Sequence, residues 1–122
     1  MQIEKAKESL QAAELCFANK LYNSTANRAY YAMFQAAVVA LEVGGAKAVG
    51  ARWSHKRVQS TFSSELIRKR KVYPTSLVQM LPKGLEIRND ADYVAGNISK
   101  RRASKILRWA RDFVERVEKV VT

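Results

Sequence analysis

The chain has 122 residues, of which 48% are hydrophobic and 27% are charged. This length and composition are typical of one globular domain, spanning residues 1–122, and argue against a disordered chain. The single cysteine, Cys16, excludes an internal disulfide and any zinc site with four cysteine ligands. We expect a cytoplasmic protein without bound metal and without a cofactor.

The balance of charge is strongly positive, because 22 lysines and arginines outweigh 11 acidic residues to give a net charge of +11. Such an excess either keeps a surface solvated or attracts a polyanion. For so short a chain we favour a nucleic acid, because each cation placed on a phosphate releases condensed counterions. A membrane is not expected, because the longest apolar run, residues 29–41, is too short to cross a bilayer.

Period-3.6 spacing of apolar residues predicts two long helices in the first third of the chain. The first covers residues 2–19, and the second runs to Val43, just before Gly44 and Gly45. Between residues 29 and 41 almost every side chain is apolar, so we expect the second helix to lie at the centre of the domain. Three residues offer oxygens to cap its start: Asn23, Ser24 and Thr25.

A glycine-bearing loop over residues 44–53 leads to a third predicted helix. Ser54 is its expected N-cap, and Val58 and Phe62 are expected to face inward. The helix ends in the basic run 68–71, whose charge suits a helix C-terminus.

Two further helices complete the pattern. The fourth opens at Thr75 or Ser76 and contains Pro82 and Gly84, which predict a kink or break near them. The fifth, residues 99–120, has one continuous apolar stripe, and we therefore predict an all-α, antiparallel bundle of about five helices. The stripe consists of Ala103, Ile106, Leu107, Ala110, Phe113, Val114, Val117 and Val121.

An arginine lies on the apolar face of the fourth predicted helix. Leu77, Leu81, Arg88 and Ala91 follow helical spacing, so the Arg88 guanidinium should point toward the interior. A desolvated guanidinium needs a partner, and Asp92, four residues on, is within reach of a bidentate pair. Arg88 is then either one half of a buried structural pair or a phosphate-binding group at the floor of a cleft.

Four segments in this order resemble the HEPN domain, and more narrowly the small HEPN proteins that often pair with a minimal nucleotidyltransferase. They are NRAYYAMFQAAVVAL (27–41), SHKRV (54–58), RNDADY (88–93) and WARDFVERVE (109–118). The resemblance covers nearly the whole chain and implies an all-α fold.

The resemblance also implies a site. HEPN ribonucleases use an Arg, a polar residue and, a few residues later, a His, which meet across a dimer interface and cut RNA without metal. Arg88 and Asn89 match the start of this motif, but Tyr93 stands where the His would fall. A phenol of ordinary pKa is a poor proton shuttle at neutral pH, so we expect cleavage to be weak or absent. His55, the only histidine, is either a structural residue or a replacement for the missing base.

The resemblance and the aromatic residues together lead us to expect a homodimer. The expected partners are RNA and a nucleotidyltransferase, as one half of a toxin–antitoxin or defence pair. The rival hypotheses are a non-catalytic helical module that binds a nucleotidyltransferase or another protein, and a generic helical adaptor whose charge keeps it soluble. We expect RNA to contact Arg88, Asn89, Lys100, Arg101, Lys105 and Arg108, while Asp92 and Arg28 have structural or orienting roles.

Overall fold

The structure is a computed structural model that describes residues 2–48, 50 and 52–122. These residues contain no strand, so the predicted all-α class is confirmed. Val49 and Ala51, within the predicted loop, lie outside the described residues. In chain order the elements are α1 (Ile3–Ala18), α2 (Tyr22–Val43), α3 (His55–Thr61), the π-helix η1 (Phe62–Lys69), the 3-10 turn η2 (Thr75–Leu77), α4 (Met80–Tyr93) and α5 (Lys100–Val121).

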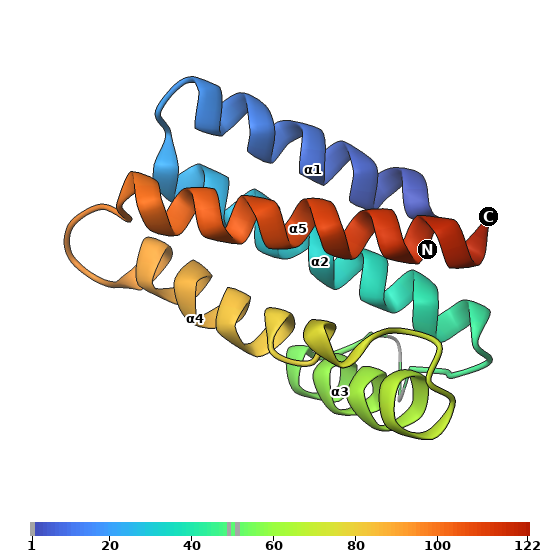
Figure 1. Cartoon of the computed structure of the whole chain (residues 1–122). Coiled ribbons are helices and arrows are strands. Elements are labelled where there is room, and N and C mark those ends of the chain that lie inside the picture. Colours follow the sequence, from blue (N-terminus) through green and yellow to red (C-terminus); the bar gives the residue numbers. More distant parts are fainter. Residues whose placement is uncertain (1, 49, 51) are drawn as a thin grey trace.

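Helix α2 is the centre of the bundle, as its composition predicts. Both α1 and α5 pack along it, and α4 lies against it on a further side (Figure 1). Every residue from Ala36 to Leu41 is buried, because neighbours cover the helix over most of its circumference. The polar exception Gln35 is half-buried and accepts a hydrogen bond of 2.6 Å from Ser9 of α1.

Helix α5 has the boundaries and the amphipathic character that the sequence predicts. The Ser99 side chain caps its start by accepting a hydrogen bond of 3.2 Å from the Arg102 N–H. Seven of the eight residues of the predicted stripe are buried, and Val121, in the last turn, is half-buried. The cations Arg101, Lys105 and Arg108 are exposed on the other side.

The start of α2 differs from the prediction. The helix begins at Tyr22, after Leu21, and no side chain caps it. The expected caps have other partners: Asn23 bonds the backbone N–H of Ile98 at 2.8 Å, and Thr25 donates to the Leu21 carbonyl at 2.8 Å. Asn23 is therefore used in a contact with a segment far along the chain, and Thr25 in a local bond to the turn that precedes it.

The third predicted helix is only partly α-helical. Ser54 caps α3 as expected, but from Phe62 the chain continues as the π-helix η1. The Arg70 N–H, for example, donates to the Glu65 carbonyl five residues back, at 3.1 Å. In this wider turn residues five apart lie closer to the same face than they do in an α-helix, which suits the joint burial of Phe62 and Ile67.

The fourth predicted helix starts later than expected. Residues 75–77 form a single 3-10 turn, and α4 begins at Met80. The break therefore comes before Pro82, which lies in the first turn of α4, where its missing N–H costs no intrahelical hydrogen bond. The helix passes through Gly84 without interruption.

Candidate functional site

Gly84 determines how closely α4 approaches α2. It is buried, and a Cβ atom on it would lie 2.7 Å from Met33 Cε and 3.4 Å from Tyr30 Cδ1. The absence of a side chain therefore lets the two helices meet. Arg88, one turn further along α4, is held against α2 as a result.

Arg88 and Asp92 form an ion pair on α4. The buried Nε of Arg88 lies 3.0 Å from Asp92 Oδ2, without the geometry of a hydrogen bond. The contact therefore uses one nitrogen and one oxygen and is not the bidentate pair that the spacing allowed. The Arg88 side chain is 16% exposed and that of Asp92 26%, so water reaches the edge of the pair.

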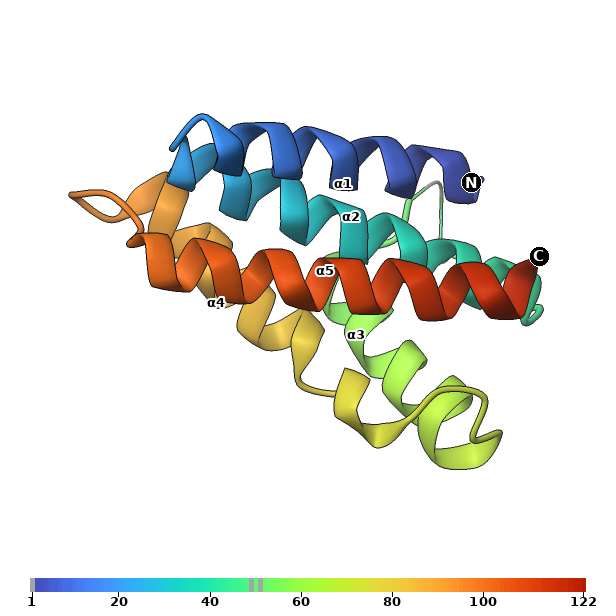
Figure 2. The same cartoon turned by 45° about the horizontal axis from the view of Figure 1, so that its top comes forward.

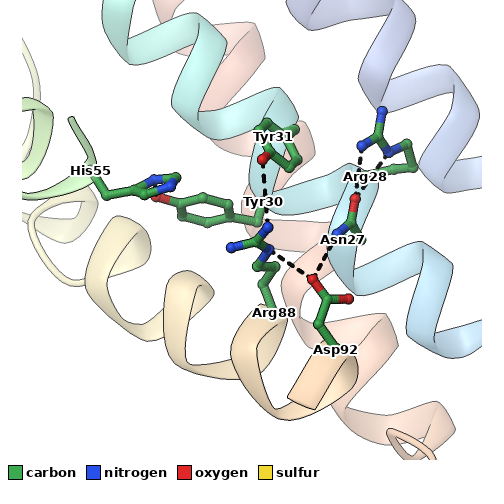
Figure 3. Close-up of polar contacts among 7 residues, drawn as sticks. All are labelled: Asn27, Arg28, Tyr30, Tyr31, His55, Arg88 and Asp92. Carbon is green, nitrogen blue, oxygen red and sulfur yellow. Dashed lines mark hydrogen bonds and ion pairs between the residues drawn. The ribbon is translucent and has the colours of Figure 1, made fainter. Parts of the chain in front are cut away.

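The pair continues into a polar network on α2, shown in Figure 3. Asn27 Nδ2 donates to Asp92 Oδ2 at 3.0 Å, and Arg88 Nη2 makes a long contact of 3.5 Å with Tyr31 Oη. Asn27 and Tyr31 are four residues apart and share one face of α2. These contacts fix Arg88 and Asp92 to α2 as well as to each other.

A second arginine completes the network. Arg28 donates from Nε and Nη2 to Asn27 Oδ1, at 3.2 and 2.8 Å. Its Cζ lies 5.1 Å from the centroid of the Tyr31 ring, and the Cζ of Arg88 lies 5.4 Å from the same centroid. Two guanidiniums thus share one aromatic ring, whose π-electrons attract both. With Asp92 as the carboxylate of the network, one positive charge is left over to attract an anion.

His55 lies on the other side of Tyr30, as the first residue of α3 (Figure 3). Its Nδ1 is 2.8 Å from Tyr30 Oη, and its ring centroid is 4.9 Å from that of Phe34. Tyr30 is fully buried and adjoins Tyr31 in the sequence, so the phenol pair links the histidine to the arginine network.

Both members of the His55–Tyr30 pair are held neutral. Burial, and after it the positive charge of Arg88, lower the pKa of His55. Burial raises the pKa of Tyr30 to about 12, so the phenol keeps its proton at neutral pH. Either Tyr30 donates to Nδ1 and the ring proton is on Nε2, or Nδ1–H donates to the phenol oxygen. In the second arrangement Nε2 is a free base.

The other predicted site residues lie outside this network. Tyr93, the last residue of α4, is 75% exposed, and Asn89 is also exposed. The α5 cations Lys100, Arg101, Lys105 and Arg108 are exposed, and Lys105 Nζ lies 5.2 Å from the Trp109 ring centroid. The α5 cation that reaches α4 is one that we did not single out: Arg102 Nη2 contacts Asp90 Oδ2 at 2.7 Å.

A hollow of about 450 Å³ borders the network between α1, α2 and α4. His55 and Arg88 are not among the residues that line it, so the hollow is separate from the His55–Tyr30 pair. It is open to solvent, and its lining consists of Cys16, Asn23, Ser24, Asn27, Arg28 and Asp92.

Sequence reasoning missed three members of the network: Asn27, Tyr30 and Tyr31. They appeared only as part of the segment 27–41 that carries the family resemblance. The available signal was the spacing of Asn27, Tyr31 and Gln35 along one helix face, which places polar groups where a helix buried on most sides should be apolar.

Residues 2–48, 50 and 52–122 gather no three His, Cys, Asp or Glu side chains in a position to hold a metal ion. Within the same residues, no helix is both long and apolar enough to span a bilayer.

Comparison with known proteins identifies the family. The family described as "HEPN domain" matches residues 1–120. A protein of Methanocaldococcus jannaschii named "Putative toxin MJ0605" is 30% identical over 122 positions, which cover 98% of this chain and 85% of that relative. A match across nearly the whole chain agrees with the all-α bundle and with the order of the four segments. The chain belongs to the HEPN family.

Proposed function

We propose that the chain is a toxin-like HEPN protein of the cytoplasm that binds RNA and is restrained by a partner antitoxin. The name of the M. jannaschii relative supports the toxin role, and the family supports the fold on which it depends. A nucleotidyltransferase is the partner that the family resemblance favours. The net charge of +11 supports an RNA target.

The observation that carries this proposal is that the adjacent Tyr30 and Tyr31 contact His55 and Arg88 respectively, so a guanidinium and an imidazole lie near one another. Arg88 holds a phosphate, because its guanidinium can offer paired donors and is always charged. His55 takes a proton from the attacking 2′-hydroxyl of RNA, since its lowered pKa keeps the ring unprotonated at neutral pH. The 2′-oxygen then bonds to phosphorus as the bond from phosphorus to the 5′-oxygen breaks, and the 5′-oxygen takes up a proton from water.

The homodimer belongs to the same proposal. A two-fold axis that brings two copies of Arg88 together would pair the same surface patch of each protomer. Apolar surface at the end of α4 supports this, because Tyr93 is 75% exposed and Val94 is 58% exposed. Large exposed side chains of this kind gain most when a partner covers them.

A second candidate function is a non-catalytic module that binds the nucleotidyltransferase. The exposure of Tyr93 favours it, because a solvated phenol in place of the expected histidine neither shuttles a proton nor contacts the Arg88 network. In this case Arg88 binds RNA without cutting it, or serves the protein interface.

Cleavage of a 5′-labelled RNA in the presence of EDTA tests the proposal. We expect weak cleavage by the wild-type protein, which Arg88→Ala and His55→Ala each abolish, and stronger cleavage by Tyr93→His. Lys83→Ala is the control, because Lys83 is an exposed cation of α4 outside the network. Strong cleavage that survives both Arg88→Ala and His55→Ala would place the chemistry elsewhere. RNA binding without cleavage in every variant would favour the second candidate.

A further inference from the structure

The positive charge is distributed unevenly along the chain. Residues 44–71 contain eight lysines and arginines and one acidic residue, a net charge of +7. Residues 1–43 contain four basic and four acidic residues, a net charge of zero. Residues 72–122 contain ten basic and six acidic residues, a net charge of +4. Most of the excess therefore belongs to one segment, residues 44–71, which we call the basic arm.

The basic arm lies beside the bundle rather than within it. Its helices α3 and η1 lean away from the long helices in Figure 2 and contact the bundle mainly through α2. Phe62, whose ring centroid is 5.2 Å from that of Phe113, anchors the arm to α5. The outer side of the arm is left to solvent, and all eight of its cations are exposed: Lys47, Arg52, Lys56, Arg57, Arg68, Lys69, Arg70 and Lys71.

Few of these cations have partners within the protein. Glu65, the one acidic residue of the arm, pairs with Lys69 at 3.3 Å, and Arg70 donates to the Gly44 carbonyl at 2.9 Å. The other six make no ion pair with any residue that the structure describes. On α5, by contrast, four cations are paired with carboxylates: Arg102, Arg111, Arg116 and Lys119.

The surface between the cations is polar. The half-buried or exposed residues of its central part are Gln59, Ser60, Thr61, Ser63, Ser64 and Glu65. They lie between two groups of cations, and hydroxyl, amide, Lys and Arg side chains are the groups that proteins use to contact phosphate and sugar. Among the described residues of the arm, no large apolar side chain is exposed. A membrane-bound helix or a protein interface needs such apolar anchors, so both occupants fit this surface poorly.

We propose that the basic arm is a second RNA-binding surface, which binds the phosphate backbone without regard to sequence and leads the strand to His55. The proposal rests on the proposed function for the identity of the polyanion, but it needs neither Arg88 nor cleavage. His55 is the first residue of α3, and Lys56 and Arg57 follow it directly. A strand bound along α3 therefore passes the pair of His55 and Tyr30.

A charge-matched pair of variants tests the arm. Arg57→Gln/Arg68→Gln removes two exposed, unpaired cations of the arm. Lys5→Gln/Lys83→Gln removes two exposed cations of α1 and α4, so both variants have the same net charge. The probe is a fluorescein-labelled oligouridylate of about 20 nucleotides, longer than most single-strand site sizes. Its anisotropy gives the binding constant between about 50 and 200 mM KCl. Circular dichroism checks that both variants keep the helical fold.

We expect the slope of log K against log salt to become shallower by about 1.4 units for the arm variant, because each single-strand phosphate contact contributes about 0.7. The Lys5/Lys83 variant should keep the wild-type slope. Equal slopes for the two variants would overturn the proposal. So would a wild-type protein that binds vesicles of phosphatidylglycerol but does not bind the RNA probe. Arg88→Ala separates this from the proposed function. If Arg88→Ala abolishes cleavage while the arm variant keeps the wild-type salt slope, the proposed function is supported and the proposal for the basic arm is contradicted.

Discussion

Arg88 combines a structural contact with the proposed phosphate site. Arg88→Ala removes the ion pair with Asp92, but Asp92 keeps its hydrogen bond from Asn27 and a side chain that is 26% exposed. We therefore expect the free energy of unfolding to fall by about 1–2 kcal/mol, less than the roughly 3–5 kcal/mol of a fully buried charge left unpaired. Urea unfolding measures this change, and the folded variant should bind RNA more weakly, because the basic arm remains.

Asp92→Asn is the companion variant for Arg88. It keeps an oxygen near Asn27 and Arg88, so the fold should survive while the positive charge of the network rises. RNA binding should then strengthen. If Arg88→Ala instead costs more than about 3 kcal/mol while the folded fraction keeps its RNA affinity, Arg88 is only a structural residue.

His55 makes the stability of the protein depend on pH. Its pKa is lowered in the folded state, so the unfolded chain takes up a proton first as the pH falls. The stability that the neutral ring contributes is complete above about pH 6.5 and is lost as the pH falls toward the lower, folded pKa. We expect urea midpoints to fall between pH 7.5 and 5.5.

His55→Gln is the control for this effect, because it keeps an acceptor near Tyr30 but does not titrate in this range. The midpoint of the variant should fall less than that of the wild type over the same interval. An equal fall in both proteins would show that carboxylates, and not His55, set the pH dependence.

At the residue scale, helical spacing was sufficient for part of the site. Arg88 and Asp92 are four apart on one helix, so their pairing follows from periodicity alone. Asn27 and Tyr31 could not be assigned to the site from the sequence, because their partners on α4 lie 65 and 57 positions further along the chain, respectively. Their partners depend on how α4 packs, and the pattern of a single helix does not contain that information.

Gly84 tests the packing of one element against another. Gly84→Leu places a large side chain where Met33 Cε would already lie 2.7 Å from a Cβ atom, within a buried contact of α4 and α2. We expect the variant to lose about 1–3 kcal/mol of unfolding free energy, as overpacked cores do. Thermal unfolding followed by circular dichroism measures the loss.

Two other substitutions bracket this result. Lys83→Leu adds the same side chain one residue away, where it is exposed, and should change stability little. Gly84→Ala should be nearly neutral, because the gain of about 1 kcal/mol in helix propensity offsets a shift of the flexible Met33 end. A Gly84→Leu protein as stable as Lys83→Leu would contradict the close approach.

At the element scale, strong periodicity decided what could be predicted. The boundaries of α5 follow from a long apolar stripe on one face of the helix. The burial of α2 follows from apolar residues around most of its circumference, which neighbouring helices must cover. The π-helix η1 was not predictable, because Phe62, Leu66 and Ile67 fit both an α-helical and a wider spacing. In the folded protein Phe62 packs against Tyr73 and Phe113, with ring centroids 5.2 Å away, and these contacts are absent from the local pattern.

For the whole molecule, the proposed homodimer gives a direct test. Light scattering at tens of micromolar should give twice the mass of the chain, since a dimer with a Kd of about 1 μM persists at that concentration. Val94→Glu places a charge on the exposed apolar surface at the end of α4 and should give a monomer. The control is Val120→Glu, which changes an exposed valine of α5. A wild-type monomer would contradict the prediction.

The uneven charge also makes the molecule an electric dipole. The field of a polyanion exerts a torque on such a dipole before contact, and turns the basic arm toward the nucleic acid while the neutral α1–α2 hairpin faces away. Productive orientations are then over-represented among collisions, so association is faster than random encounters allow. The proposed nucleic acid would then bind at the basic arm, and the proposed protein partner would bind on the surfaces that face away from it.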